Sequence, residues 1–242
     1  MKLSMTYSVR TKGFNHIFDE TVRLYRQAVS FFVDVCLTEW DVISAGQFQK
    51  ERVNLVESLT IQTKQNPVVS YDFSAEFYKF PSYLRRAAIA EALGKVSSYR
   101  SNLANWKAAD PAKRGEKPSL PQVGYVYPAM YRSGMFIRTG IYQAALKVFI
   151  RNTWDWVLVD LRKSDADYIL RHCKNYRECV PTLQKRGKKW FLDFVFQTAV
   201  KLPDTKIQHT RILAVDLGLN SACTCSIMTP EGAVLGREFL SL

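Results

Sequence analysis

The chain has the composition of an ordinary globular protein and a large excess of positive charge. Its 242 residues are 47% hydrophobic and 23% charged, so it can build a sizeable core, and its length allows two modules. Lys and Arg number 34 against 22 Asp and Glu, which gives a net charge of +12. This excess favours nucleic acid as the partner, because Lys and Arg neutralise phosphates and release counterions. A basic protein without such a partner is the alternative.

The cysteine content and the N-terminus exclude two further classes of protein. Five cysteines in a chain of this length are too few, and odd in number, for a disulfide framework. The first 14 residues lack an apolar segment of signal-peptide type, and no run of about 18 apolar residues occurs anywhere. We therefore expect a cytoplasmic protein without a membrane partner.

A short strand and a long helix are predicted at the N-terminus. The first ten residues alternate weakly in hydropathy, as a strand does. Apolar residues then recur at three- or four-residue steps, with one longer gap bridged by Trp40, which predicts a helix. Asn15 and Asp19 are candidates to cap its start. The apolar stripe of this helix consists of Phe18, Val22, Tyr25, Val29, Phe32, Cys36 and Ile43.

Two more helices are predicted before residue 111. One spans residues 47–64, and Pro67 marks its end. The other opens at Pro81 and Ser82 and closes at Asp110-Pro111, because the residue before a proline disfavours helix. Its apolar stripe is Leu84, Ala88, Ala92, Val96, Tyr99, Leu103 and Trp106.

Cationic residues follow one flank of the third predicted helix. Arg86, Arg100 and Lys107 are spaced by 14 and 7 residues, so they share one edge of the apolar stripe. A proline-rich loop with further cations, Lys113, Arg114 and Lys117, follows. We expect phosphate contacts along this edge. The alternative is that these cations only form a solvent-exposed helix face.

From residue 118 the pattern changes to strands. The predicted strands are Val123–Tyr127, Met135–Arg138, Leu146–Arg151 and Trp154–Leu161, and a short helix is predicted over Asp165–Lys174. Lys189–Val200 has alternating apolar residues and follows a turn at Gly187, which predicts a hairpin. The hairpin carries the basic residues Lys185, Arg186, Lys188 and Lys189, which either contact RNA or keep a turn solvated. The block is typical of a small antiparallel β-barrel or sheet, with the helices of residues 15–110 inserted after the first strand.

The last 32 residues contain the candidate catalytic residue, Asp216. The strands predicted there are Ile212–Val215, Ala222–Met228 and Ala233–Phe239. The first delivers Asp216, Gly218 follows two residues later, and a turn sequence, Thr229–Gly232, separates the other two. A strand ending in Asp, then Gly, then two antiparallel strands is how an RNase H-like fold begins.

Asp216 is a candidate ligand for Mg²⁺. Hydrolysis of a phosphodiester by two Mg²⁺ ions needs several carboxylates, which hold the ions about 3.5–4 Å apart. Neither Glu231 in the predicted turn nor Glu238 on the third strand is an obvious partner. The alternative is an ordinary strand-end Asp in a turn.

The residues Ala214–Ser226 resemble the first RuvC motif of the TnpB (OrfB) proteins of bacterial insertion sequences, relatives of the type V CRISPR effectors. The order of the preceding segments, Glu20–Ala28, Phe80–Arg86 and Lys188–Leu192, also resembles that family. The resemblance covers essentially the whole chain and is most specific in the RuvC segment.

The resemblance implies an α+β fold in which a wedge-like antiparallel barrel (residues 1–12 and 118–207) carries a helical recognition insert (13–117). The first three strands of an incomplete RuvC-like domain (208–242) follow. It also implies a guide RNA that finds DNA by base pairing, in a protein associated with transposition. Asp216 matches the family's first catalytic carboxylate, so Mg²⁺ is the implied cofactor.

The chain lacks several motifs of the family's pattern. The second and third RuvC motifs, with their Glu and Asp, and the zinc ribbon would lie beyond residue 242. No cysteine pair has C-x-x-C spacing, so we expect no zinc, and core packing is the expected role of Cys223 and Cys225. We therefore predict a truncated, TnpB-like protein that binds RNA and DNA but does not cleave DNA alone. Mg²⁺-dependent cutting that is lost in Asp216→Ala would contradict this.

Two alternatives belong to other classes of protein. One is a catalytically inactive RNA-guided regulator that only binds DNA. The other, more remote, is an actin-like ATPase fragment, whose Asp-x-Gly hairpin is similar; ATP would then shift the melting temperature. We expect no small-molecule substrate. The residues expected to contact nucleic acid are Arg86, Arg100, Lys107, Lys185, Arg186, Lys188 and Lys189.

Overall fold

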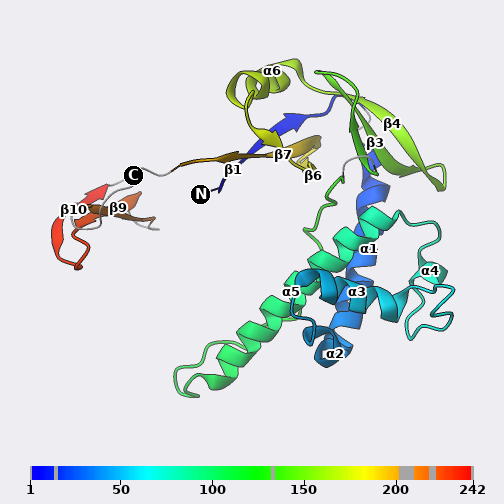
Figure 1. The fold of residues 1–242 in the computed structure, drawn as a ribbon, viewed down its shortest axis with the longest axis horizontal. Coiled ribbons are helices and arrows are strands. Elements are labelled where there is room, and N and C mark those ends of the chain that lie inside the picture. The colour runs from blue at the N-terminus through cyan, green and yellow to red at the C-terminus, as the bar shows by residue number, and fades with distance from the viewer. Residues whose placement is uncertain (1, 14–15, 132–133, 202–209, 218–221, 241–242) are drawn as a thin grey trace. The chain divides into compact units, whose positions relative to one another are not determined.

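The computed structural model describes residues 2–13, 16–131, 134–201, 210–217 and 222–240 (Figure 1). The chain divides into two compact units, one of Ser4–Thr198 and the other of Met1–Leu3 with Ala199–Leu242. The larger unit contains all of the described helices and two antiparallel sheets, and the smaller contains a three-stranded sheet. No helix in the described ranges is long and apolar enough to cross a membrane.

The first half of the larger unit is helical. Its two long helices, α1 and α5, pack against each other, and the shorter helices lie beside them (Figure 1). The bounds are α1 Ile17–Thr38, α2 Trp40–Ser44, α3 Gln49–Thr60, α4 Phe73–Glu76 and α5 Ser82–Ala108. Every member of the apolar stripe predicted from Phe18 to Ile43 is buried, which confirms the helical period.

The helix boundaries differ from the predicted ones at three points. The first helix ends at Thr38, because the backbone of Glu39 leaves the helical conformation (φ −100°, ψ 22°), and Ile43 therefore belongs to α2. Helix α3 ends at Thr60 rather than at 64, because Asn66 folds back and its amide donates to the carbonyl of Ser58 (2.8 Å). Asp19 lies inside the first turn of α1 instead of capping it, and Asn15 lies outside the described residues.

Helix α5 has the predicted length but only part of the predicted core face. Its buried residues end at Val96, while Tyr99, Leu103 and Trp106 are half-buried. The last three turns of α5 therefore extend beyond the core, so helical periodicity there does not indicate burial.

Aromatic rings fill the space between the helices and the β-sheet to which Trp154 belongs. Phe73 stacks on Phe32 (ring centroids 4.8 Å apart) and on Phe77 (4.6 Å). Phe80 meets Trp154 of the sheet edge-on at 5.3 Å. The aromatic cluster joins helices and sheet in one hydrophobic core.

Two antiparallel sheets complete the larger unit. The three-stranded sheet has the order β2-β3-β4, and in the four-stranded sheet β7 pairs with β1, β5 and β6. The bounds are β1 Lys2–Arg10, β2 Phe136–Arg138, β3 Gln143–Ile150, β4 Thr153–Asp160, β5 Arg177–Glu178, β6 Thr182–Arg186 and β7 Lys189–Ala199, with helix α6 at Lys163–His172.

The hairpin of β6 and β7 confirms its prediction. The residues Trp190, Leu192, Phe194 and Phe196 alternate along β7 and are all buried. Gly187 supplies the turn with a φ of +58°. A second two-residue turn, Arg151-Asn152, joins β3 to β4 with positive φ at both residues (49° and 62°), as a type I′ turn requires.

The predicted strand Val123–Tyr127 is wrong. The segment forms a turn, in which the Val126 amide donates to the Val123 carbonyl (3.2 Å). Pro121 and Pro128 flank it, and a proline has no N–H for a sheet ladder. The sheets of the described residues do not close into a barrel, so the barrel stays a prediction.

The smaller unit contains the three strands predicted near Asp216. They are β8 Ile212–Asp216, β9 Cys223–Met228 and β10 Val234–Leu240, paired antiparallel in the order β10-β9-β8. Gly232, with a φ of +92°, lies in the turn before β10. Its assignment to an RNase H-like domain stays a prediction, because many folds contain such a meander. Gly218 lies outside the described residues.

Candidate nucleic-acid interface

A cavity of about 330 Å³ lies between the first half of α1 and the β6–β7 hairpin. We call it the α1–hairpin groove. Arg23 and Arg26 of α1 line it from the same side of the helix, since they are three residues apart. Lys185 of β6 adds a third cation. The complete lining is Asp19, Val22, Arg23, Arg26, Gln27, Tyr127, Lys185 and Trp190.

One wall of the groove is a cation held against an aromatic ring. The Arg26 guanidinium lies 4.9 Å from the centre of the Tyr127 ring, and its Nε donates to the carbonyl of Val126 (3.0 Å). The Tyr127 hydroxyl in turn donates to the carbonyl of Lys185 (3.2 Å). These contacts hold helix, turn and hairpin around the groove, and the ring and the guanidinium both present flat surfaces.

The cations of the groove have carboxylate partners. Lys185 Nζ lies 2.5 Å from Asp19 Oδ1. Arg23 binds both oxygens of Glu20, and this hydrogen bond lowers the pKa of the Glu20 carboxyl. Because both pairs are largely exposed, each is worth at most about 1 kcal/mol. Phosphates can therefore replace these carboxylates at little cost.

The turn beside the groove contains the other predicted hairpin residues. Arg186 binds Asp193 Oδ2 at 2.5 Å and the Ser8 hydroxyl at 2.8 Å. Asp193 is only 6% exposed, so the charge of Arg186 is largely offset. Lys188, the last residue of the turn, and Lys189, the first residue of β7, are both exposed. Of the four hairpin cations, these two are the most available to a polyanion.

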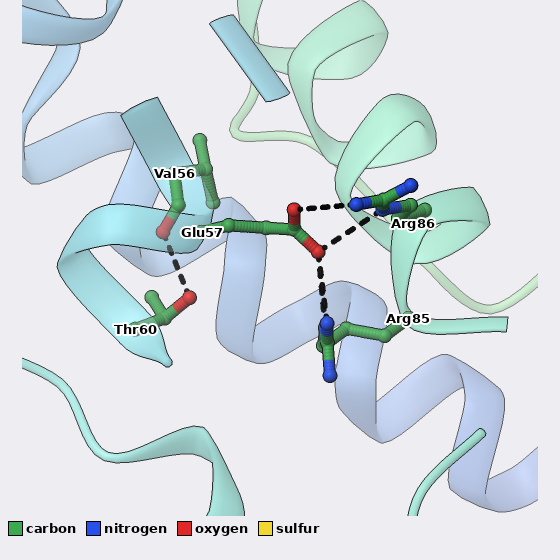
Figure 2. A network of polar contacts seen from close by, with 5 residues as sticks. All are labelled: Val56, Glu57, Thr60, Arg85 and Arg86. Carbon is green, nitrogen blue, oxygen red and sulfur yellow. Dashed lines mark hydrogen bonds and ion pairs between the residues drawn. The ribbon is translucent and has the colours of Figure 1, made fainter. Parts of the chain in front are cut away.

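The structure gives Arg86 a partner within the helical layer. Figure 2 shows Glu57 of α3 between the two arginines at the start of α5, with Glu57 oxygens 2.9 Å from Arg85 and 3.3 Å from Arg86. Burial raises the pKa of the Glu57 carboxyl, but the hydrogen bonds from Arg86 and Arg85 outweigh it and the net pKa is lowered. Arg86 thus helps to join α3 to α5, and its contact with nucleic acid stays a prediction.

The other two cations predicted on α5, Arg100 and Lys107, do not line the α1–hairpin groove either. Arg100 donates to the carbonyl of Leu37 (2.9 Å), in the last turn of α1, and so caps that helix from outside. Lys107 is exposed near the end of α5. Arg86 and Lys107 are 21 residues apart, about 30 Å along a helix, so the shared flank is a line and not a cluster.

Asp216 is the last residue of β8 and is exposed. The pairing places it beside Thr224 of β9, which in turn lies beside Phe239 of β10. Glu238 precedes Phe239 and is aligned with Cys225, so it faces the opposite side of the sheet from Asp216. Glu231 lies in the turn before β10, where a hydrogen bond with Thr229 lowers the pKa of its carboxyl.

These positions do not fit a Mg²⁺ centre by themselves. Among the residues that the structure describes, no three His, Cys, Asp or Glu side chains lie close enough to hold a metal ion. Asp216 would be one ligand of such a centre, and the others would have to come from elsewhere. The thiols of Cys223 and Cys225 lie 3.8 Å apart on one face of β9, and their hydrogen bond raises the pKa of Cys225.

The cations of α1 and the ring of Tyr127 are not among the residues predicted from the sequence to contact nucleic acid. Arg23 and Arg26 stand at i and i+3, off the apolar stripe of α1, which is a usable signal for a cationic helix face. No local pattern marks Tyr127, because its contact with Arg26 spans about 100 residues of chain.

Helix α1, which forms one side of the groove, lies in the part of the chain that matches a known protein family. Residues 4–150 match the Aq_aa04 family, which is more than half of the chain. The chain belongs to the Aq_aa04 family. A relative in Aquifex aeolicus (strain VF5), described as uncharacterized protein aq_aa04, is 32% identical over 133 residues, which cover 50% of this chain and 74% of the relative. The matched range contains most of β1 and all of α1 to α5, β2 and β3, whereas the β6–β7 hairpin and the strand of Asp216 lie after it.

Proposed function

We propose that this chain binds RNA, and DNA paired to it, through the α1–hairpin groove and the neighbouring turn, as a TnpB-like protein does. The observation that carries the proposal is the convergence of Arg23, Arg26 and Lys185 on one groove that also contains an aromatic ring, Tyr127. Cations beside flat aromatic surfaces are the usual means of holding a nucleic-acid strand.

Each part of the interface has a different role in this proposal. Lys188 and Lys189 attract the phosphate backbone and set the salt dependence of binding, because they are exposed. Arg23 and Lys185 exchange their carboxylate partners for phosphates, while Arg26 keeps its contacts with the protein and supports the ring of Tyr127.

The test is a titration of a fluorescein-labelled hairpin RNA, followed by anisotropy between about 50 and 200 mM salt. The double variant Lys188→Ala/Lys189→Ala should weaken binding and reduce the slope of log K against log salt by about two, since each lost phosphate contact removes about one. The double variant Lys50→Ala/Lys64→Ala is the matched control, because it removes the same charge from exposed sites around α3. Equal slopes in both variants, or no binding by the parent chain, would refute the proposal.

A second candidate is a protein that binds an RNA–DNA hybrid without cutting it. It is favoured by the position of Asp216, which has no carboxylate beside it on its face of the described sheet. In this case RNA-dependent occupancy of one DNA sequence should occur with no Mg²⁺-dependent cleavage. Cutting that is abolished by Asp216→Ala would instead favour the nuclease.

A further inference from the structure

A second, smaller cavity of about 230 Å³ lies between α1, the loop after α4 and the β3–β4 hairpin. We call it the aromatic pocket. Its lining is Leu24, Glu76, Phe77, Tyr78, Phe80, Phe149, Asn152 and Trp154. Five of these eight side chains are aromatic, and the pocket lies at the edge of the hydrophobic core, since Phe80 belongs to the core and Phe77 and Trp154 pack against it.

The rings stand at angles that keep the pocket open. Trp154 meets Phe80 at 74° and Phe149 at 66°, so these rings form walls and do not stack into the space between them. Tyr78 also lines the pocket and is 76% exposed, so its ring is accessible from solvent. A flat ligand can thus enter and be covered by rings on several sides.

The pocket is lined by one carboxylate, that of Glu76, and two cations stand beside it in the chain, so the net local charge favours an anionic strand over a cationic ligand. Asn152 offers an amide that can both donate and accept hydrogen bonds. Exposed cations stand directly beside two lining residues in the chain, Lys79 next to Tyr78 and Arg151 next to Asn152. The Lys79 ammonium already lies over the Tyr78 ring, 5.0 Å from its centre, and a second cation would be repelled there.

The pocket's size and position also favour a base of a nucleic-acid strand as the ligand. Its volume lies below the range of about 300–1,000 Å³ that is typical for drug-sized ligands, so it suits a single flat ring system. Leu24 of the pocket lies on α1 between Arg23 and Arg26 of the groove. Both sites therefore border the same turn of a helix that is about 10–12 Å across, a span that a few nucleotides can cover.

We propose that the aromatic pocket receives one unpaired base of a single-stranded nucleic acid whose phosphates lie near Lys79 and Arg151. The base stacks on the exposed rings and its edge bonds to Asn152. This inference rests on the proposed function and adds to it a site that distinguishes bases from backbone.

The experiment compares binding of a single-stranded oligoadenylate RNA with that of an abasic oligomer of the same length, by anisotropy. The parent chain should bind the oligoadenylate about tenfold more tightly, because stacking of one base contributes about 1–3 kcal/mol. Tyr78→Ala should remove most of this preference without changing the salt slope, and Tyr78→Phe should retain it. Phe48→Ala, which removes another exposed ring, is the control and should keep the preference.

Asn152→Gly tests the hydrogen bond without disturbing the fold. Glycine suits the positive φ of 62° at this turn position, so the variant should melt like the parent chain while its preference for bases falls.

The outcomes separate the two proposals. Equal binding of both oligomers, with the salt slope still dependent on Lys188 and Lys189, would overturn the pocket and leave the proposed function standing. Binding of neither oligomer nor the hairpin RNA would overturn both. Quenching of tryptophan fluorescence by choline but not by adenosine monophosphate would show a cation site and would also overturn the pocket proposal.

Discussion

Glu57 forms ion pairs with two arginines of α5 from the facing helix α3 (Figure 2). Its side chain is 16% exposed and that of Arg85 is 19% exposed, so this contact is better shielded than the pairs of the groove. Removal of the carboxylate would leave Arg85 without this partner in a partly buried position, which costs more than the loss of an exposed pair.

Glu57→Gln should therefore lower the free energy of unfolding by about 1–2 kcal/mol at neutral pH. Because the pKa of Glu57 is lowered in the folded state, its contribution is present above the unfolded value of about 4.3 and is lost as pH falls through the folded value. The difference between variant and parent, measured by urea unfolding, should thus shrink as the pH is lowered below about 4.

Glu20→Gln is the matched control, since Glu20 forms an exposed pair with Arg23. It should cost less than about 0.5 kcal/mol. Similar losses in both variants, or a difference that grows in acid, would contradict the role assigned to Glu57.

The sequence shows how many cations the chain has, but it does not show which of them are paired with carboxylates in the fold. Lys185 and Asp19 are 166 positions apart, and Arg86 and Glu57 are 29 apart, so no local spacing reveals either pair. Lys188 and Lys189 were predicted as contacts for the same reason as Lys185 and Arg186, yet only the fold shows that they differ in partners.

At the scale of elements, the end of α5 is stabilised by its own following loop. Arg114 donates to the carbonyls of Ala109 (2.7 Å) and Lys107 (3.0 Å), and it lies 4.6 Å from the centre of the Trp106 ring. The Trp106 indole donates to the carbonyl of Gly115 (2.7 Å). Arg114 thus acts as a C-terminal cap, although the sequence placed it among possible phosphate ligands.

Arg114→Ala should accelerate amide hydrogen exchange in residues 105–109 by about fivefold, which corresponds to about 1 kcal/mol of lost local stability. The global melting temperature should stay unchanged, because the buried part of α5 ends at Val96. Lys113→Ala is the control, as Lys113 is exposed in the same loop. If exchange does not change, Arg114 does not cap the helix.

The element types were largely predictable because each has its own period. The stripe of α1 and the alternation along β7 are local patterns, and both are buried as predicted. The segment Val123–Tyr127 failed because β-forming side chains cannot compensate for prolines on both sides. The end of α1 at Thr38 has no proline or glycine to mark it.

At the scale of the molecule, the hydrophobic core belongs to one unit. Every residue of the described core cluster lies between Val9 and Phe196. In the smaller unit, none of the described residues from 210 to 240 is buried. A three-stranded sheet without a packed face is marginal by itself.

A chain ending at residue 201 should therefore unfold at the same temperature as the larger unit of the full chain. The full chain should bind more of the dye ANS than the shortened one, because the described sheet exposes apolar side chains such as Leu213, Leu235 and Phe239. A lower melting temperature of the shortened chain, measured by circular dichroism, would mean that residues 202–242 contribute to the core.

The sequence by itself determined the net charge, the apolar periods of the long helices, the β7 strand and the three strands around Asp216, because these depend on neighbours within a few residues. Only the tertiary structure decided that Arg23, Arg26 and Lys185 meet in one groove, that Glu57 holds Arg86, and that aromatic residues from three segments enclose a pocket. These arrangements join residues tens to more than 150 positions apart. Their geometry is set by how the helices pack on the sheets, which no local period records.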